Sequence, residues 1–150
     1  MDFRGLNMGG IDLQGLDLRG WQFGRCNLTG ANFSGCDLRG VNFNSAILSG
    51  ARLVGASAQH ANFTDARMDR TDLSSANFEY ALMTRVSLKG ATAVRANFSE
   101  AILRKAKCQH ADFTEAKLQT ANAPVASFRG AIMPNGFRYG RRVTRVLPKL

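Results

Sequence analysis

The chain has 150 residues, which is the size of one domain. It contains no apolar run of 18 residues, so we expect no membrane-spanning helix. The formal net charge of +9 favours an anionic partner over a cationic one. The repeat described next begins at residue 1 and leaves no room for a signal peptide. We therefore expect a cytoplasmic protein, or one secreted without a cleaved signal peptide.

A five-residue repeat runs through residues 1–135 without an insertion or deletion, giving 27 consecutive units. It is clearest in residues 31–40, ANFSG followed by CDLRG. A small residue comes first, Asp or Asn is common second, and a large apolar residue is third. Polar residues or Gly fill the fourth and fifth positions. The third position is reduced to alanine only at Ala58, Ala93 and Ala123.

A strict period of five fits neither an α-helix, with 3.6 residues per turn, nor a long strand, with a period of two. The small–polar–large order is strand alternation over three residues, which points two side chains inward and one outward. The next two residues must then turn a corner. Such units cannot bury their apolar faces alone, so the pattern predicts an all-β solenoid of stacked coils.

The repeat closely resembles the motif A(D/N)LXX of the pentapeptide repeat family over 135 of the 150 residues. The resemblance implies a right-handed quadrilateral β-helix with four units, or twenty residues, in each coil. The chain would then form nearly seven coils, roughly 32 Å long at about 4.8 Å per coil. Phe3, Phe23, Phe43 and Phe63 would stack inside one wall.

Glycine fills the fifth position in nine of the first eleven units, and afterwards only at Gly90 and Gly130. A type II turn favours Gly at its third residue because φ is positive there. We therefore expect type II corners before about residue 56 and a different class of turn after it.

The cysteines and histidines do not suggest a metal site or a disulfide, and we expect no cofactor. Cys26 and Cys36 occupy small inward positions on opposite walls, and Cys108 occupies a third position. His60 and His110 fall at corners of different walls and coils.

The two ends of the chain depart from the repeat. The first coil has bulky residues at its small positions, from Met1 to Trp21, which would fill an open mouth or be covered by a partner. Residues 136–150 form a basic segment outside the repeat. Its apolar residues have helical spacing: Tyr139, Val143, Val146 and Leu147. We expect a short helix that caps the last coil, with a homodimer contact or a disordered basic tail as alternatives.

No nucleophile constellation and no phosphate-binding loop is present, so we expect no enzyme. Residues 1–75 carry seven Arg and seven Asp, so the positive excess lies in the second half. One wall of the predicted solenoid is net acidic and carries Asp12, Asp72, Asp112 and Glu115. We predict a basic seam, defined as the outward residues Arg85, Lys89, Arg104, Lys105, Lys107 and Arg129. The seam would bind an anionic partner, or would only keep the walls soluble.

Three functions compete. The first is a rigid, non-enzymatic scaffold for protein–protein interaction, such as a bacterial adaptor or effector. The second is modulation of DNA gyrase, because some pentapeptide repeat proteins resemble a DNA duplex and protect gyrase from quinolones. That role rests on an acidic surface and often on loops, whereas this chain is basic and its repeat has no loop. The third is direct nucleic-acid binding by the seam, for which interleaved surface aromatic residues are missing.

Overall fold

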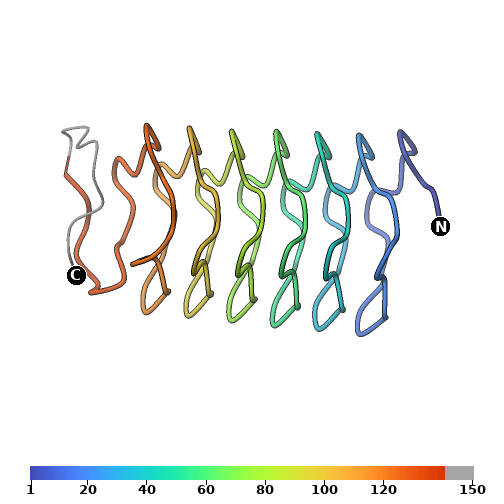
Figure 1. Ribbon diagram of the computed structural model, residues 1–150, viewed down its shortest axis with the longest axis horizontal. Coiled ribbons are helices and arrows are strands. Elements are labelled where there is room, and N and C mark those ends of the chain that lie inside the picture. The colour runs from blue at the N-terminus through green and yellow to red at the C-terminus, as the bar shows by residue number, and fades with distance from the viewer. Residues whose placement is uncertain (141–150) are drawn as a thin grey trace.

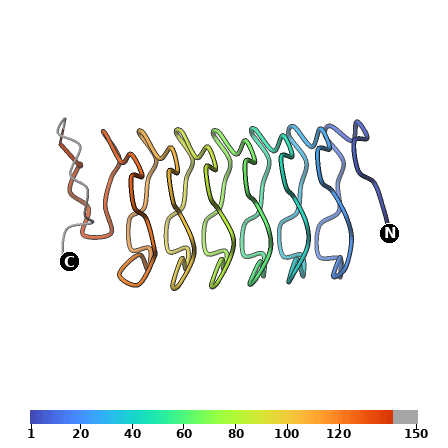
Figure 2. The ribbon, with the colours of Figure 1, turned by 45° about the horizontal axis from the view of Figure 1, so that its top comes forward.

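The computed structural model describes residues 1–140, which form one elongated stack of coils with residue 1 at one end (Figure 1). Turning the stack by 45° shows the same succession of coils side by side (Figure 2). Each coil pairs with the next at a separation of twenty residues, from Asp2 with Gln22 to Asp112 with Ile132, and every such bridge is parallel. The predicted solenoid with four five-residue units per coil is therefore observed.

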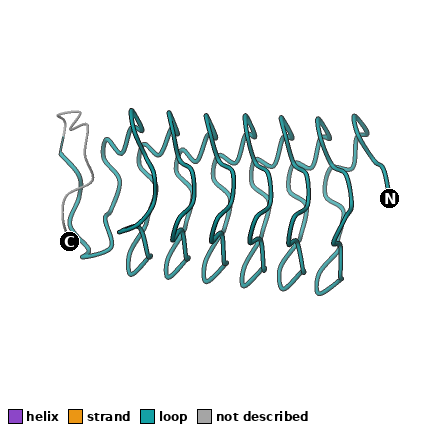
Figure 3. Cartoon of the chain, viewed as in Figure 1, coloured by secondary structure: helices purple, strands orange, loops and turns teal. Residues whose placement is uncertain are grey.

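The walls are too short for regular strands. Each five-residue unit contributes one bridging residue, its second, and the next turn begins two residues later. Residues 1–140 accordingly contain no helix and no strand longer than one bridging residue (Figure 3). The stack is held by backbone hydrogen bonds on both sides of that residue. Phe23 N–H donates to Asn42 O at 2.8 Å, and Asn42 N–H to Trp21 O at 3.5 Å.

The expectation of two classes of corner is wrong. Gly at the fifth position has positive φ, for example 66° at Gly35, as a left-handed corner requires. However, φ is also positive at fifth positions without Gly, such as Ser75 at 58° and Arg95 at 58°. The change near residue 56 is one of residue type. The fifth N–H donates to the next coil in both halves, which holds other residues in the left-handed region.

The interior is a continuous apolar core of first and third positions. Phe23, Phe43 and Phe63 are fully buried and stack with centroid separations of 5.2 and 4.9 Å. Phe33 meets Phe43 edge-on at 5.5 Å across the core. Aromatic pairs of this kind add about 1 kcal/mol beyond the burial of their area. The inward positions predicted from the repeat are therefore confirmed.

The three cysteines are buried and free, and none forms a disulfide within residues 1–140. The Cys26 thiol donates to Phe3 O at 2.7 Å, and the Cys36 thiol to Leu13 O at 2.9 Å. Complete burial raises the pKa of Cys108 to about 12. All three behave as small core residues rather than as nucleophiles.

The last described residues fold back over the final coil. Arg138 forms an antiparallel bridge with Ile132, and Tyr139 N–H donates to Ala131 O at 2.7 Å. The Tyr139 ring lies 6.3 Å from Phe128 in an edge-on arrangement. Tyr139 thus covers the core from an extended segment and not from the predicted helix. The other apolar residues of that predicted helix, Val143, Val146 and Leu147, lie outside the described residues.

Among residues 1–140, no segment folds back over the opposite end. Met1, Leu6 and Leu16 are 73%, 51% and 47% exposed, although Phe3 and Met8 pack against the core beneath them. The bulky first-position residues thus form an open apolar surface at this end. No helix among residues 1–140 has the length and hydropathy needed to span a membrane.

Candidate partner-binding surface

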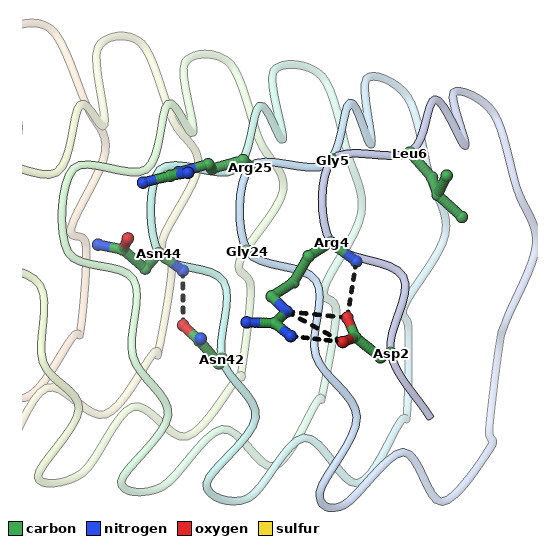
Figure 4. Close-up of a pocket in the computed structure, with 8 residues that line it drawn as sticks. All are labelled: Asp2, Arg4, Gly5, Leu6, Gly24, Arg25, Asn42 and Asn44. Carbon is green, nitrogen blue, oxygen red and sulfur yellow. Dashed lines mark hydrogen bonds and ion pairs between the residues drawn. The ribbon is translucent and has the colours of Figure 1, made fainter.

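The hollows in the surface are shallow spaces between coils. One of about 710 Å³ forms beside Gly24, which lacks a side chain between Arg4 and Asn44 (Figure 4). Two pairs of its polar groups are hydrogen-bonded to each other. Arg4 Nη2 donates to Asp2 Oδ2 at 2.6 Å, and Asn44 N–H donates to Asn42 Oδ1 at 2.9 Å. The hydrogen bond from Arg4 lowers the pKa of Asp2 to about 2, so this carboxylate is a poor general acid at neutral pH.

Titratable groups do not converge elsewhere in the described chain. No cluster of three or more His, Cys, Asp or Glu side chains suited to a metal ion occurs in residues 1–140. His60 stacks face-to-face on Tyr80, one coil later on the same corner, with ring centroids 5.1 Å apart. The carboxylates point outward, and several of them form ion pairs with arginines. Asp17 and Asp37 bind Arg19 and Arg39, each at 2.6 Å.

The structure brings four of the six seam residues together. Arg85 and Lys105 occupy the same corner in successive coils, and Arg85 N–H donates to Arg104 O at 2.8 Å. Lys107 begins the next wall, where it bridges to Ser87. All four side chains are exposed. They form a compact basic corner over the fifth and sixth coils, which we call the basic corner from here on.

The other two predicted seam residues lie apart from the basic corner. Lys89 and Arg129 stand two coils apart at the far side of the wall that Lys107 begins, with Gln109 between them. Arg129 lines a separate hollow of about 360 Å³ with His110, Arg138 and Tyr139, next to the folded-back segment. Their role in partner binding stays a prediction.

The positive charge of Arg85 is compensated within the chain. Its guanidinium contacts both oxygens of Asp65, one coil earlier, at 2.6 and 2.7 Å. This side-chain hydrogen bonding lowers the pKa of Asp65 and raises that of Arg85. By contrast, Arg104, Lys105 and Lys107 take part in no ion pair with a described residue. These three cations carry the uncompensated charge of the basic corner.

An apolar feature that the sequence analysis missed lies on the same wall. Outward second positions usually hold Asp or Asn, whose side-chain oxygen accepts the N–H two residues later, as Asn62 does from Thr64 at 3.0 Å. Leu82 and Ile102 replace that residue in successive coils and bridge to each other. Leu82 is 41% exposed and Tyr80, at the preceding corner, is 48% exposed. The departure from Asp or Asn was the sequence signal that could have found it.

Comparisons with known proteins agree with this geometry. The family model for pentapeptide repeats matches in eight copies, over residues 7–44, 22–57, 51–90 and 81–119. The chain belongs to the pentapeptide repeat family. Among solved structures, a pentapeptide repeat protein from the thylakoid lumen of Arabidopsis thaliana is 36% identical. That similarity covers 67% of this chain and 70% of the relative, with a TM-score of 0.65.

Two further structures share the fold of this pentapeptide repeat protein. Rfr23 from the cyanobacterium Cyanothece 51142 is 21% identical, with 88% and 90% of the two chains covered and a TM-score of 0.68. QnrB1, a plasmid-mediated fluoroquinolone resistance protein, is 21% identical, with 89% of this chain and 70% of that chain covered and a TM-score of 0.53. No curated protein matches the sequence. The matched family is a structural repeat family and does not indicate an enzyme.

Proposed function

We propose that this pentapeptide repeat protein is a non-enzymatic scaffold that binds another protein through the basic corner. One observation supports this most directly. Arg104, Lys105 and Lys107 are exposed, adjacent and without an ion pair to any described residue, whereas five arginines of residues 1–140, including Arg85 of the same corner, form ion pairs. A rigid wall that holds uncompensated cations at fixed spacing favours an anionic surface of complementary shape.

The proposal also includes the handedness of the coil, the cellular role and the oligomeric state. We infer that the coil is right-handed, as the resemblance to pentapeptide repeat proteins implies. We also propose an adaptor or effector role, and a homodimer through the C-terminal end as the oligomeric form. The compartment stays a prediction, either the cytoplasm or release without a cleaved signal peptide. The Arabidopsis relative comes from the thylakoid lumen.

The test is differential capture of partners from lysate. Arg104→Glu/Lys105→Glu reverses the uncompensated charges, and both side chains point outward, so folding should survive. Arg25→Glu/Arg52→Glu is the matched control, because both residues are exposed and form no ion pair in the described chain. We expect the first variant to lose a partner that the wild type and the control retain. Equal capture by all three proteins would contradict the proposed binding face.

Salt titration and duplex DNA separate this function from its competitors. Neutralising about three DNA phosphates would give a log–log salt slope near −2.7, without preference for one protein partner. A protein partner should instead be captured selectively, with a shallower salt dependence. Inhibition of DNA gyrase by the wild-type chain would favour the topoisomerase role. QnrB1 shares only the fold at 21% identity, so that role has weaker support.

A further inference from the structure

The wall that ends at the basic corner changes chemistry along its length. Its outward second positions are polar in the first four coils and again in the seventh: Asp2, Gln22, Asn42, Asn62 and Asn122. Between Asn62 and Asn122 stand Leu82 and Ile102. The parallel bridges continue unbroken through all of them. Since polar residues hold the same position on both sides, the fold does not demand apolar side chains here.

Leu82 and Ile102 give up a local hydrogen bond that this position ordinarily makes. Asn42 accepts Asn44 N–H at 2.9 Å and Asn62 accepts Thr64 N–H at 3.0 Å on this wall. Neither aliphatic side chain can accept a hydrogen bond from Thr84 or Arg104. An aliphatic side chain at this outward position also exposes apolar area to solvent, and Leu82 is 41% exposed. Two consecutive coils therefore sacrifice a stabilising contact in the free protein.

An isolated apolar residue at a second position needs no explanation, because single exposed hydrophobic side chains are common. Ile47, 38% exposed on the next wall, is such a case, since its bridging neighbours are Asn27 and Arg67. Leu82 and Ile102 differ because they pair with each other, and because exposed Tyr80 precedes Leu82 by one corner. We call Tyr80, Leu82 and Ile102 the apolar strip.

Charge borders the apolar strip unevenly. Arg104 and Lys105 follow Ile102 directly, at the basic corner, and form no ion pair within the described part of the chain. On the other border Glu100 is exposed, and its backbone N–H donates to the Thr120 hydroxyl oxygen at 3.1 Å. Tyr and Arg, here Tyr80 and Arg104, are residue types enriched at energetically important interface centres.

We propose that the apolar strip and the adjoining Arg104 and Lys105 dock an acidic segment of a partner protein that carries apolar side chains. The apolar side chains of the segment would cover Leu82 and Ile102, and its carboxylates would contact Arg104 and Lys105. This inference rests on the proposed scaffold function and specifies the chemistry of the partner.

Other occupants fit the surface less well. Leu82 and Ile102 offer nucleic acid neither a stacking face nor a hydrogen bond, and one face of Tyr80 is already covered by His60. A strip two coils long between Asn62 and Asn122 is too small to insert into a lipid layer. A symmetric contact between two copies would place the uncompensated cations of both chains against each other.

The test begins with selection of short random peptides on phage against the full chain. We expect enrichment of sequences that combine Leu, Ile or aromatic residues with Asp or Glu. A labelled synthetic copy of the most enriched peptide then reports affinity by fluorescence anisotropy. Leu82→Asn/Ile102→Asn restores the residue found on both sides of the strip, so it should fold, and we expect it to weaken peptide binding about tenfold or more.

Two further variants complete the design. Ile47→Asn is the matched control, because it makes the same change outside the strip, and its affinity should stay within about twofold of wild type. Arg104→Gln/Lys105→Gln should weaken binding and remove most of its dependence on salt. Peptides without an acidic and apolar bias, or equal binding by Leu82→Asn/Ile102→Asn, would overturn the inference.

The failure of this inference is distinguishable from failure of the scaffold function. If Arg104→Glu/Lys105→Glu loses its protein partner while Leu82→Asn/Ile102→Asn retains it, the scaffold function is supported and docking on the apolar strip is contradicted. If neither variant changes capture, both proposals are contradicted. Duplex DNA that binds through Arg104 and Lys105 more tightly than any selected peptide would overturn the inference. Light scattering that shows self-association abolished by Leu82→Asn/Ile102→Asn would overturn it as well.

Discussion

Individual corner residues adopt a backbone conformation that their side chains disfavour. Tyr80, Arg85 and Glu100 have φ near 57° without being Gly. The N–H group of such a residue holds it there, as when Tyr80 N–H donates to Ser99 O at 3.1 Å. A left-handed conformation costs an L-residue about 1 kcal/mol relative to Gly. The stacked coils must therefore offset this cost at each of the fourteen non-Gly residues with positive φ.

Gly35→Ala should destabilise the protein by about 1 kcal/mol. Its φ is 66°, and a Cβ placed there would meet nothing closer than Gly15 Cα at 4.0 Å. The cost would therefore come from φ alone. Ser45→Gly is the reverse control. It removes the cost of φ 57° at this corner, but Gly raises the conformational entropy of the unfolded chain, so the two effects should nearly cancel. Thermal melting should show a Tm lowered by about 2–4 °C for the first change and little shift for the second. An unaltered Tm for Gly35→Ala would contradict the φ argument.

At the scale of the coil, charged side chains form ladders that cross from one coil to the next. Arg19 contacts Asp17 at 2.6 Å within its coil and Asp37 at 3.4 Å in the next one. Hydrogen bonding from Arg19 lowers the pKa of Asp17 from 3.8 to about 2, and Arg39 lowers the pKa of Asp37. A lowered pKa in the folded state means that this stabilisation is present above about pH 4 and is lost as the pH falls toward 2.

Asp17→Asn/Asp37→Asn should reveal this dependence. Asn keeps the side-chain oxygen that accepts the N–H two residues later, as Asn32 does from Ser34 at 3.1 Å, but removes the ion pairs. We expect a slightly lower Tm than wild type at pH 7, and a difference that shrinks below about pH 4. Added salt at pH 7 should reduce the difference too, because the groups are exposed. A constant Tm difference from pH 7 to pH 2 would contradict the electrostatic origin.

At the scale of the whole molecule, the two ends of the described stack differ. The first coil leaves Met1, Leu6 and Leu16 exposed, whereas residues 136–140 close part of the last coil. Met133 N–H donates to Phe137 O at 2.8 Å, and Tyr139 covers Phe128. This closure covers apolar side chains and pairs backbone groups that the last coil would otherwise present to solvent.

Truncation after Asn135 should lower stability by on the order of 2 kcal/mol and promote association, because it removes these backbone hydrogen bonds and exposes Phe128. Truncation after Gly140 keeps those contacts and serves as the control for stability. It also removes Val143, Val146 and Leu147, so a change of mass from dimer to monomer by light scattering would support the predicted homodimer. Equal stability and solubility of both truncated chains would mean that residues 136–140 do not cap the stack.

The sequence by itself determined which positions face the core and where the corners fall. Both are local properties, repeated without interruption in units of five, and a large apolar residue such as Phe43 must enter the core wherever its unit lies. The number of units per coil came from the resemblance to a family rather than from the spacing. That number was needed to place Leu82 beside Ile102 and Arg85 beside Lys105.

The tertiary structure decided which outward side chains interact. Asp65 neutralises Arg85 across twenty residues, and this contact depends on the rotamers that the two side chains adopt in neighbouring coils. Stacking also holds Arg95 at positive φ, because its N–H donates to Thr114 O in the next coil at 2.9 Å. The contact between coils thus overrides the preference of a non-Gly residue for negative φ. Tyr139 lies in an extended return rather than a helix because the last coil offers free backbone groups to pair with.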